Sequence, residues 1–206
     1  MVFVKNIPIE FSKKDILRYL GFKPRKSEKG EFIDSMVEEA IDAAWLILEP
    51  AALLETLNVD RIYSNKIVFS RTGLELLGKG IAQFMSPCSK VSLVAATIGA
   101  NIDREIERLF SEQDSSRAVV LDAVGSDAVE QVVSWVDTLV QQEAEKQGFR
   151  TLHRVSPGYP LWAVEGNRHI GEALKAEKIG IEVLPSCQLL PRKSVFAAIG
   201  WVPKDV

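Results

Sequence analysis

The longest helical pattern in the sequence runs from about residue 116 to 147 and ends at Gly148. Small and apolar residues recur along it at alternating intervals of three and four, which is the spacing of one face of an α-helix. They are Leu121, Gly125, Ala128, Val132, Trp135 and Leu139. At 1.5 Å per residue this helix would be about 48 Å long. We therefore expect it to be the spine of the domain, with the small residues of its first half allowing close approach of another element.

Two nearly continuous apolar runs, 90–98 and 194–202, predict strands that are buried on both faces. Shorter strands are expected at 62–63 and 67–69, as a hairpin, and at 179–183, while 22–31 is expected to be a loop. Helices are expected at 12–20, at 35–48, from 72 to about 84, from a cap at Asn101, and at 164–176. No repeat or linker is visible. The pattern predicts one α+β domain, 1–206, with a central, mostly antiparallel sheet, the long spine helix and flanking helices.

The helix starts rest on capping patterns. Ser35 with Glu38, and Thr72 with Glu75, have the spacing of a capping box, in which each side chain accepts a hydrogen bond from the other's backbone N–H. Ser12 can cap the first helix in a simpler way. Residues 1–85 are expected to form a helical and hairpin N-terminal part, distinct from 86–206, for which a family resemblance is given below.

Composition excludes several classes of protein. With 47% hydrophobic and 26% charged residues, the chain is neither disordered nor fibrous. No stretch of about 18 apolar residues suits a membrane span, and the first residues lack a signal-peptide pattern. Cys88 and Cys187 stand far apart and outside any metal-binding spacing, which favours two buried thiols in a reducing compartment. We expect a cytoplasmic protein.

The charges are unevenly distributed along the first 60 residues. Residues 1–30 carry eight Lys or Arg and three Asp or Glu, whereas residues 31–60 carry eight acids and no base. The basic stretch is too short, and too poor in interleaved aromatic residues, to predict nucleic-acid binding. The two segments either face each other as solvated surfaces or provide a docking face for another protein.

Most catalytic constellations are missing from the sequence. The two histidines, His153 and His169, have no partner at metal-ligand spacing, and there is no Walker A, G-x-S-x-G or G-x-G-x-x-G motif. The glycines of 78–80 are expected inside a helix as packing positions. The segment 119–127 resembles the glycine-rich turn of Rossmann-type methyltransferases, but its period favours the spine helix. Both interpretations of that segment stay open at this point.

The segment 154–160, with the sequence RVSPGYP, has the pattern of a ligand-binding loop. Pro157 and Gly158 suit the two central positions of a type II turn. Such a turn exposes backbone polar groups and presents Tyr159 as a platform. Arg154, four residues before Gly158, carries the side chain that grips carboxylates with two parallel hydrogen bonds. A small-anion or zwitterion site is therefore plausible beside a purely structural turn.

The same residues carry a resemblance to a known family. The R-x-x-x-G-Y-P loop, the helix after it, Gly180-Ile181, and the spaced residues Ser186, Pro191, Ser194 and Val195 resemble the reactivation domain of cobalamin-dependent methionine synthase. The segments ATIG (96–99) and LDA-x-GS-x-AVE (121–130) also occur in stand-alone relatives of that domain. The resemblance covers roughly 90–202 and implies S-adenosylmethionine as the cofactor.

Carried over residue by residue, the resemblance implies five binding positions. Arg154 would pair with the methionyl carboxylate, the backbone of Ser156 would meet the adenine end, Gly158 would shape the loop, and Tyr159 would pack near the cofactor. Glu130 would balance the positive charge, although Asp127, Glu130, Ser134 and Asp137 can also form a solvated stripe. No catalytic side chain and no metal ligand is implied.

The resemblance also implies a partner. The chain has no recognisable cobalamin-binding segment, so cobalamin would be supplied by a separate corrinoid-dependent methionine synthase or related methyltransferase, with a flavodoxin- or ferredoxin-type reductant. The implied function is reductive methylation of that cobalamin. Two alternatives stay open: a non-catalytic S-adenosylmethionine-binding or scaffold subunit, and a Rossmann-type small-molecule methyltransferase.

Overall fold

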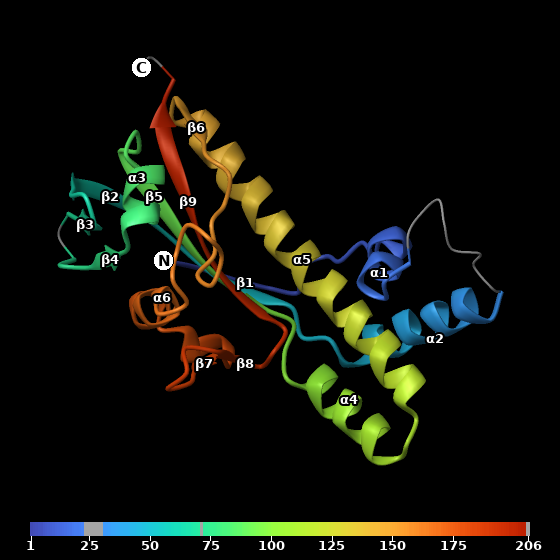
Figure 1. Cartoon of the computed structure of the whole chain (residues 1–206). Coiled ribbons are helices and arrows are strands. Elements are labelled where there is room, and N and C mark those ends of the chain that lie inside the picture. The colour runs from blue at the N-terminus through green and yellow to red at the C-terminus, as the bar shows by residue number, and fades with distance from the viewer. Residues whose placement is uncertain (23–30, 71, 205–206) are drawn as a thin grey trace.

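A computed structural model describes residues 1–22, 31–70 and 72–204 (Figure 1). The strands are β1 (Val2–Lys5), β2 (Ala51–Ile62), β3 (Lys66–Phe69), β4 (Glu75–Leu77), β5 (Lys90–Thr97), β6 (Phe149–Thr151), β7 (Glu182–Val183), β8 (Leu189–Leu190) and β9 (Ser194–Pro203). The helices are α1 (Lys13–Tyr19), α2 (Glu31–Ile47), α3 (Lys79–Phe84), α4 (Asn101–Ser111), α5 (Ser115–Lys146), α6 (Gly166–Leu174) and a 3₁₀ turn, η1 (Ala176–Ile179). Within those residues, no helix combines the length and apolar character that a membrane crossing requires.

The described residues form a seven-stranded, fully antiparallel sheet in the order β4-β3-β2-β5-β9-β6. The long strand β2 pairs with β5 along one edge. Along its other edge its first residues pair with β1 and its last residues pair with β3, and the β2–β3 pairing shifts register between Val59 and Arg61. A small second sheet contains β7 and β8. The prediction of an α+β domain with a mostly antiparallel sheet is confirmed.

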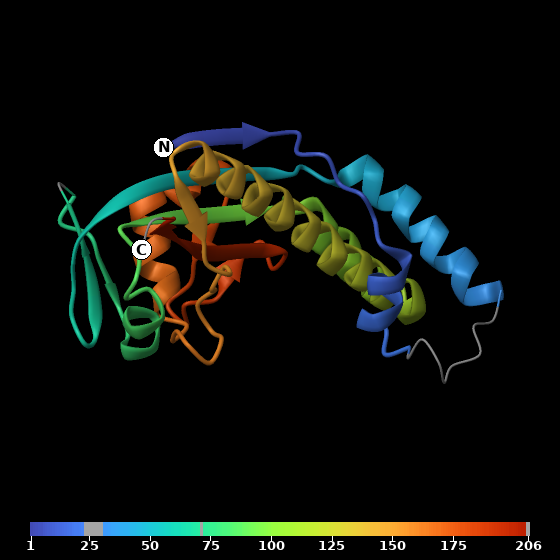
Figure 2. The ribbon, with the colours of Figure 1, turned by 90° about the horizontal axis from the view of Figure 1, so that it is seen from above.

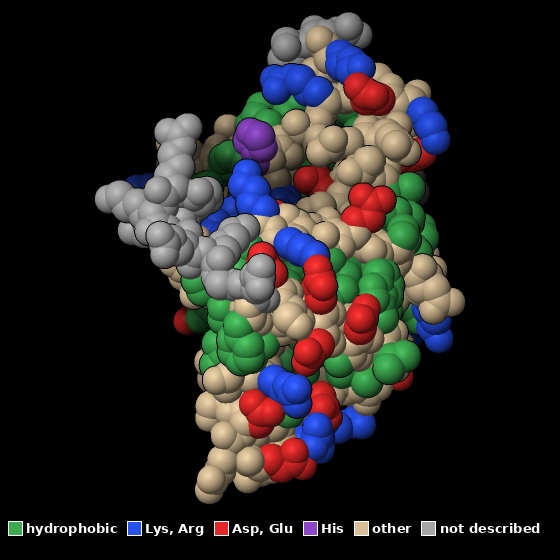
Figure 3. Space-filling model, turned by 90° about the vertical axis from the view of Figure 1, so that its right-hand side faces the viewer, with side chains coloured by type: hydrophobic (Ala, Val, Ile, Leu, Met, Phe, Trp, Pro, Cys, Tyr) green, Lys and Arg blue, Asp and Glu red, His purple; other side chains and the backbone are tan. Residues whose placement is uncertain are grey.

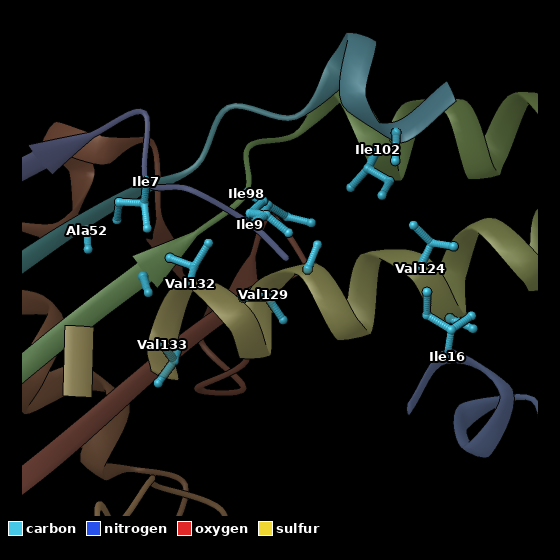
Figure 4. Close-up of a cluster of buried hydrophobic side chains, with 14 of the residues drawn as sticks. Ile7, Ile9, Ile16, Ala52, Ile98, Ile102, Val124, Val129, Val132 and Val133 are labelled. Atoms are coloured by element: carbon cyan, nitrogen blue, oxygen red, sulfur yellow. The ribbon is translucent and has the colours of Figure 1, made fainter. Parts of the chain in front are cut away.

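The helix α5 is the spine that the sequence predicts, and Figure 1 shows it running along the sheet in roughly the same line as β9. It packs with α1, α2 and α4 on one face, and Figure 4 shows the buried cluster there, with Ile98 and Ile102 lying above Val124, Val129 and Val132 of α5. A second buried cluster lies on the other face of the sheet, under α3 and α6.

The position of β5 between two buried clusters explains why its sequence is mostly apolar. Side chains alternate between the two faces of a strand, so Val94 and Ala96 belong to the α5 cluster while Leu93 and Ala95 belong to the α6 cluster. Both faces are covered, and neither exposes β5 to water. The small residues of α5 also allow another element to approach closely, as predicted. A Cβ added to Gly125 would lie 2.9 Å from Cδ1 of Ile102 on α4.

The two predicted capping boxes are wrong. α2 begins at Glu31, and Ser35 lies inside the helix, where its hydroxyl donates to Glu39. No helix starts at Thr72, whose Oγ1 instead accepts a hydrogen bond from the backbone N–H of Leu74, 3.2 Å away, in a turn. Glu75 lies in β4 and pairs with Lys66 of β3 at 2.8 Å. The side chain of Glu75, which the local pattern predicts to cap a helix, instead forms an ion pair between two strands.

Other differences concern short elements and the N-terminal part. α4 begins at Asn101 with Ala100 as its cap, and the strand expected at 179–183 is mostly the turn η1, followed by the two residues of β7. Most of the loop expected at 22–31 lies outside the described residues. β1 and β2 belong to the main sheet and α1 and α2 pack on α5, so residues 1–85 are built into the fold that 86–206 completes.

The Rossmann interpretation of 119–127 is wrong. These residues are helical throughout and lie within α5. Gly125 does not form a turn under a cofactor; it makes room for Ile102 and for the side chain of Lys193, whose Cε would lie 3.3 Å from an added Cβ. The amine of Lys193 bonds Asp122 at 2.9 Å and Ser126 at 2.8 Å, so the polar residues of this segment fasten β9 to α5.

Candidate functional site

The loop between β6 and α6, residues 152–165, is an extension of the main sheet. Val155 exchanges two backbone hydrogen bonds with Ala198 in the middle of β9, of 2.9 and 2.8 Å. The side chain of Val155 is buried. Because neighbouring side chains of an extended segment point to opposite faces, Arg154 and Ser156 are directed away from that core, and both line a cavity. The 152–165 loop is therefore held on a rigid strand.

The tip of the loop is a tight turn at the predicted place. Gly158 has φ of +91°, a conformation that suits the third position of a type II turn. Its N–H donates to the carbonyl of Trp162 at 2.9 Å, and the N–H of Trp162 donates to the carbonyl of Tyr159 at 2.9 Å. Tyr159 is 67% exposed, so the turn presents its ring outward.

Trp162 anchors the turn and was not identified from the sequence. Its ring is buried, and Nε1 donates to the carbonyl of Leu77 at 3.0 Å. A Cβ on Gly166 would lie 2.5 Å from this ring, and one on Gly80 would lie 2.4 Å from the carbonyl oxygen of Leu161. The glycines of 78–80 are packing positions, as expected, although they begin α3 instead of lying inside a helix.

A large cavity, of about 1080 Å³, lies between the 152–165 loop, α5 and the start of β9. Its wall includes Glu130, Arg154, Ser156 and Tyr159, while Gly158 shapes the turn beside it. The other side consists of residues from β8, from β9 and from the segments that precede each of these strands. They are Leu184, Gln188, Leu189, Leu190, Arg192, Ser194, Val195 and Phe196. Four of the five predicted binding residues thus line one cavity.

Opposite charges meet in this cavity. Nη2 of Arg154 donates to Oε2 of Glu130 on α5, and both side chains are only partly buried. Nη1 of Arg154 is buried and has no hydrogen-bond partner among the described residues. A carboxylate and a guanidinium side by side can accept both ends of an amino-acid zwitterion, since the ligand's ammonium suits Glu130 and its carboxylate suits Arg154.

The polar stripe on α5 is not simply solvated. Asp127 is 1% exposed, and its Oδ2 accepts a hydrogen bond from the backbone N–H of Ser12 at 2.9 Å. Its Oδ1 accepts from Gln131 at 3.4 Å. Burial raises the pKa of Asp127, and the hydrogen bond from Ser12 only partly opposes that shift. Asp127 therefore fixes the start of α1 against α5, one turn of helix from Glu130.

That attachment brings an unpredicted residue, Tyr19, to the cavity wall. Tyr19 is the last residue of α1, and Figure 2 shows α1 on the lower side of α5, which is also the side of the 152–165 loop. Burial raises the pKa of Tyr19, and the negative charge of Glu130 raises it further. Sequence spacing could not reveal this neighbour, because the two residues meet only when α1 packs on α5.

The far rim of the cavity is tied to α4. The backbone N–H of Arg192 donates to Asp103 at 2.7 Å, and its Nε lies 3.5 Å from the same carboxylate. Across the β7–β8 hairpin, Nδ2 of Asn167 donates to the carbonyl of Cys187 at 2.8 Å. Cys187 and Cys88 are both free and buried, as expected. Hydrogen bonds to α4 and α6 therefore hold the segments before and after β8 in place.

No protein-family model matches the chain, and no curated protein matches its sequence. Its structure is similar to a solved one, the crystal structure of the MetH reactivation domain bound to AdoHcy, with a TM-score of 0.71. The likeness covers 97% of this chain and 77% of that chain, at 15% sequence identity. The chain has the fold of the MetH reactivation domain. At this identity the likeness shows the fold alone, and it extends over the first 85 residues, which the sequence resemblance did not include.

Proposed function

We propose that the cavity binds S-adenosylmethionine and that the protein supports reductive methylation of cobalamin carried by a separate corrinoid-dependent methionine synthase or related methyltransferase. The observation that carries the proposal is the pairing of Arg154 with Glu130 in the cavity wall, within the fold of a domain solved with AdoHcy. The volume of about 1080 Å³ is slightly above that of ordinary ligand pockets, which measure about 300–1,000 Å³.

Each residue of the cavity wall would contact a different part of the ligand. Arg154 would bind the methionyl carboxylate, and Glu130 would accept hydrogen bonds from the ammonium. The backbone of Ser156 would meet the adenine end, while the turn at Gly158 would place Tyr159 over the cofactor. S-adenosylmethionine supplies a methyl group already activated on a sulfonium, so the contribution of the protein is to orient that group and exclude water around it.

Titration calorimetry with S-adenosylmethionine tests the binding site. Hydrogen bonds to charged groups contribute about 1.5–3 kcal/mol, so Arg154→Ala should raise the Kd about 10- to 100-fold. Glu130→Gln should also raise it. Arg117 and Glu39 form a matched control, because they are an ion pair between α5 and α2 outside the cavity. Arg117→Ala and Glu39→Gln should leave the Kd unchanged.

Two results would separate the remaining possibilities. If Arg154→Ala binds as tightly as the wild type, the cavity is not the site. If the wild type binds S-adenosylmethionine but forms no methylcobalamin with a corrinoid-carrying methyltransferase and a flavodoxin- or ferredoxin-type reductant, the chain is a non-catalytic binding or scaffold subunit. Formation of methylcobalamin that is lost with Arg154→Ala supports the full proposal.

A further inference from the structure

Tyr19 occupies a position in the cavity wall that no feature of the sequence assigns. Its side chain is 44% exposed, yet the helix that carries it is firmly attached. Ile16 and Leu17 of α1 are buried in the cluster around α5. The N–H of Ser12 is bonded to the buried carboxylate of Asp127. The ring of Tyr19 is therefore placed beside the cavity by the fold.

The surroundings of this ring suit a positive charge. Tyr19 and Glu130 both line the cavity. Burial raises the pKa of the Tyr19 phenol, and the negative charge of Glu130 raises it further. The guanidinium of Arg18 lies 5.5 Å from the ring centroid, within the range of a cation–π contact. Arg18 is itself neutralised by Asp15 at 3.1 Å. A ligand cation would therefore meet an electron-rich ring beside a carboxylate.

The two positive groups of S-adenosylmethionine need different partners. An ammonium has three N–H donors and is satisfied by hydrogen bonds to a carboxylate. A methylsulfonium has no donor, so an aromatic face and a nearby negative charge are the groups that can stabilise it. Glu130 alone serves the first group. Tyr19 supplies the aromatic face that the methylsulfonium requires.

We propose that Tyr19, beside Glu130, contacts the methylsulfonium of the ligand and makes the cavity prefer S-adenosylmethionine over neutral S-adenosylhomocysteine. This inference rests on the function proposed above. It has a consequence for turnover, because the sulfur loses its charge when the methyl group leaves. The contribution of Tyr19 then disappears, and release of the product is favoured over release of the methyl donor.

The test compares both ligands by calorimetry. A cation–π contact contributes about 0.5–2 kcal/mol, so Tyr19→Leu should raise the Kd for S-adenosylmethionine about 3- to 30-fold. The Kd for S-adenosylhomocysteine should stay the same. Tyr19→Phe keeps the ring and should keep the preference. Tyr63 is a matched control, since it is also 44% exposed and near a lysine and an arginine, but lies outside the cavity. Tyr63→Leu should change neither Kd.

The outcomes distinguish this inference from the function on which it rests. If Tyr19→Leu weakens both ligands equally, or neither, Tyr19 does not sense the charge on sulfur and the inference is overturned, while loss of binding in Arg154→Ala still supports the site. If the wild type binds neither ligand, the proposed function fails and the inference fails with it. Circular dichroism and thermal melting of Tyr19→Leu exclude unfolding as the cause of a weaker titration.

Discussion

Gly200 of β9 faces the second buried cluster, where there is no room for a side chain. A Cβ at this position would lie 2.3 Å from Sγ of Cys88 and 2.6 Å from Sδ of Met85. Both sulfur-containing side chains are buried, and burial also raises the pKa of the Cys88 thiol to about 11. The thiol is therefore protonated and acts as a packing group at neutral pH.

Gly200→Ala should consequently destabilise the protein. Overpacking a filled core costs about 1–3 kcal/mol, which urea denaturation would measure as a lower midpoint. Cys88→Ala removes the nearer clash, so the same glycine substitution should cost less in that background. Equal stability of Gly200→Ala and the wild type would show that β9 can move away from α3, contrary to the packing seen here.

At the scale of elements, α1 depends on one buried carboxylate. Asp127→Ala would leave the backbone N–H of Ser12 without its acceptor, and an unsatisfied buried donor costs about 1–3 kcal/mol. Asp127→Asn keeps an acceptor oxygen and should be far less damaging. Chemical denaturation would give both values. Because α1 carries Tyr19, Asp127→Ala should also weaken S-adenosylmethionine binding more than Asp127→Asn does.

The same carboxylate predicts a pH dependence with a definite sign. Burial raises the pKa of Asp127 in the folded state above its ordinary value of 3.8. The folded protein then holds this proton more tightly than the unfolded chain, so the contribution of Asp127 to stability falls as the pH rises from about 3.8 through the raised pKa. The free energy of unfolding of Asp127→Asn minus that of the wild type should therefore increase over that interval and then level off. A constant difference from pH 4 to pH 7 would contradict the burial of a charged group here.

At the scale of the whole molecule, charge suggests how a partner docks. Figure 3 shows acidic side chains alongside exposed hydrophobic ones on the face that carries α2. Among the acids of 31–60, Glu38 pairs with Lys13 and Glu39 with Arg117, while Asp42 lies exposed on α2. We propose this acidic segment as part of the contact with the corrinoid protein. The basic residues of 23–30 lie outside the described residues.

Binding to the corrinoid protein should therefore weaken with salt. Exposed charges are screened over about 8 Å at physiological ionic strength and over shorter distances above it. The Kd measured by surface plasmon resonance should rise steadily between low and high salt, and Asp42→Asn should flatten that dependence. Asp60→Asn, a charge removal in β2 away from α2, is the control. A Kd that does not respond to salt would show that docking is not electrostatic.

The sequence identified the elements whose patterns are long and uniform. α5 was predictable because small and apolar residues recur along it at helical spacing, although in its C-terminal half Val136 and Val140 are buried while Trp135 and Leu139 are only partly buried. β5 and β9 were predictable because strands covered on both faces are apolar at most positions. β2 was mostly missed, although Leu57 and Val59 alternate with polar neighbours. Local patterns failed where a distant partner competed, as when Lys66 paired with Glu75.

The candidate site divides in the same way. Arg154, Ser156 and Tyr159 follow from a loop motif that is contiguous in sequence. Glu130 was placed at the site only by the family resemblance, and its ion pair with Arg154, 24 residues away in the sequence, was not predicted. Tyr19 has no local signal, since its place depends on Asp127, a residue whose polar stripe suggested exposure to water. Sequence periodicity does not predict which helices pack together, so it cannot predict a cavity wall built from separate helices.

The cavity wall takes residues from Tyr19 near one end of the sequence to Phe196 near the other. The complete pocket therefore requires the packing of segments from nearly the whole sequence. Any molecule held there stabilises the native state alone, by an amount that grows with the logarithm of its concentration. A ligand of this cavity, which we propose to be S-adenosylmethionine, should therefore slow proteolysis of the protein as its concentration rises.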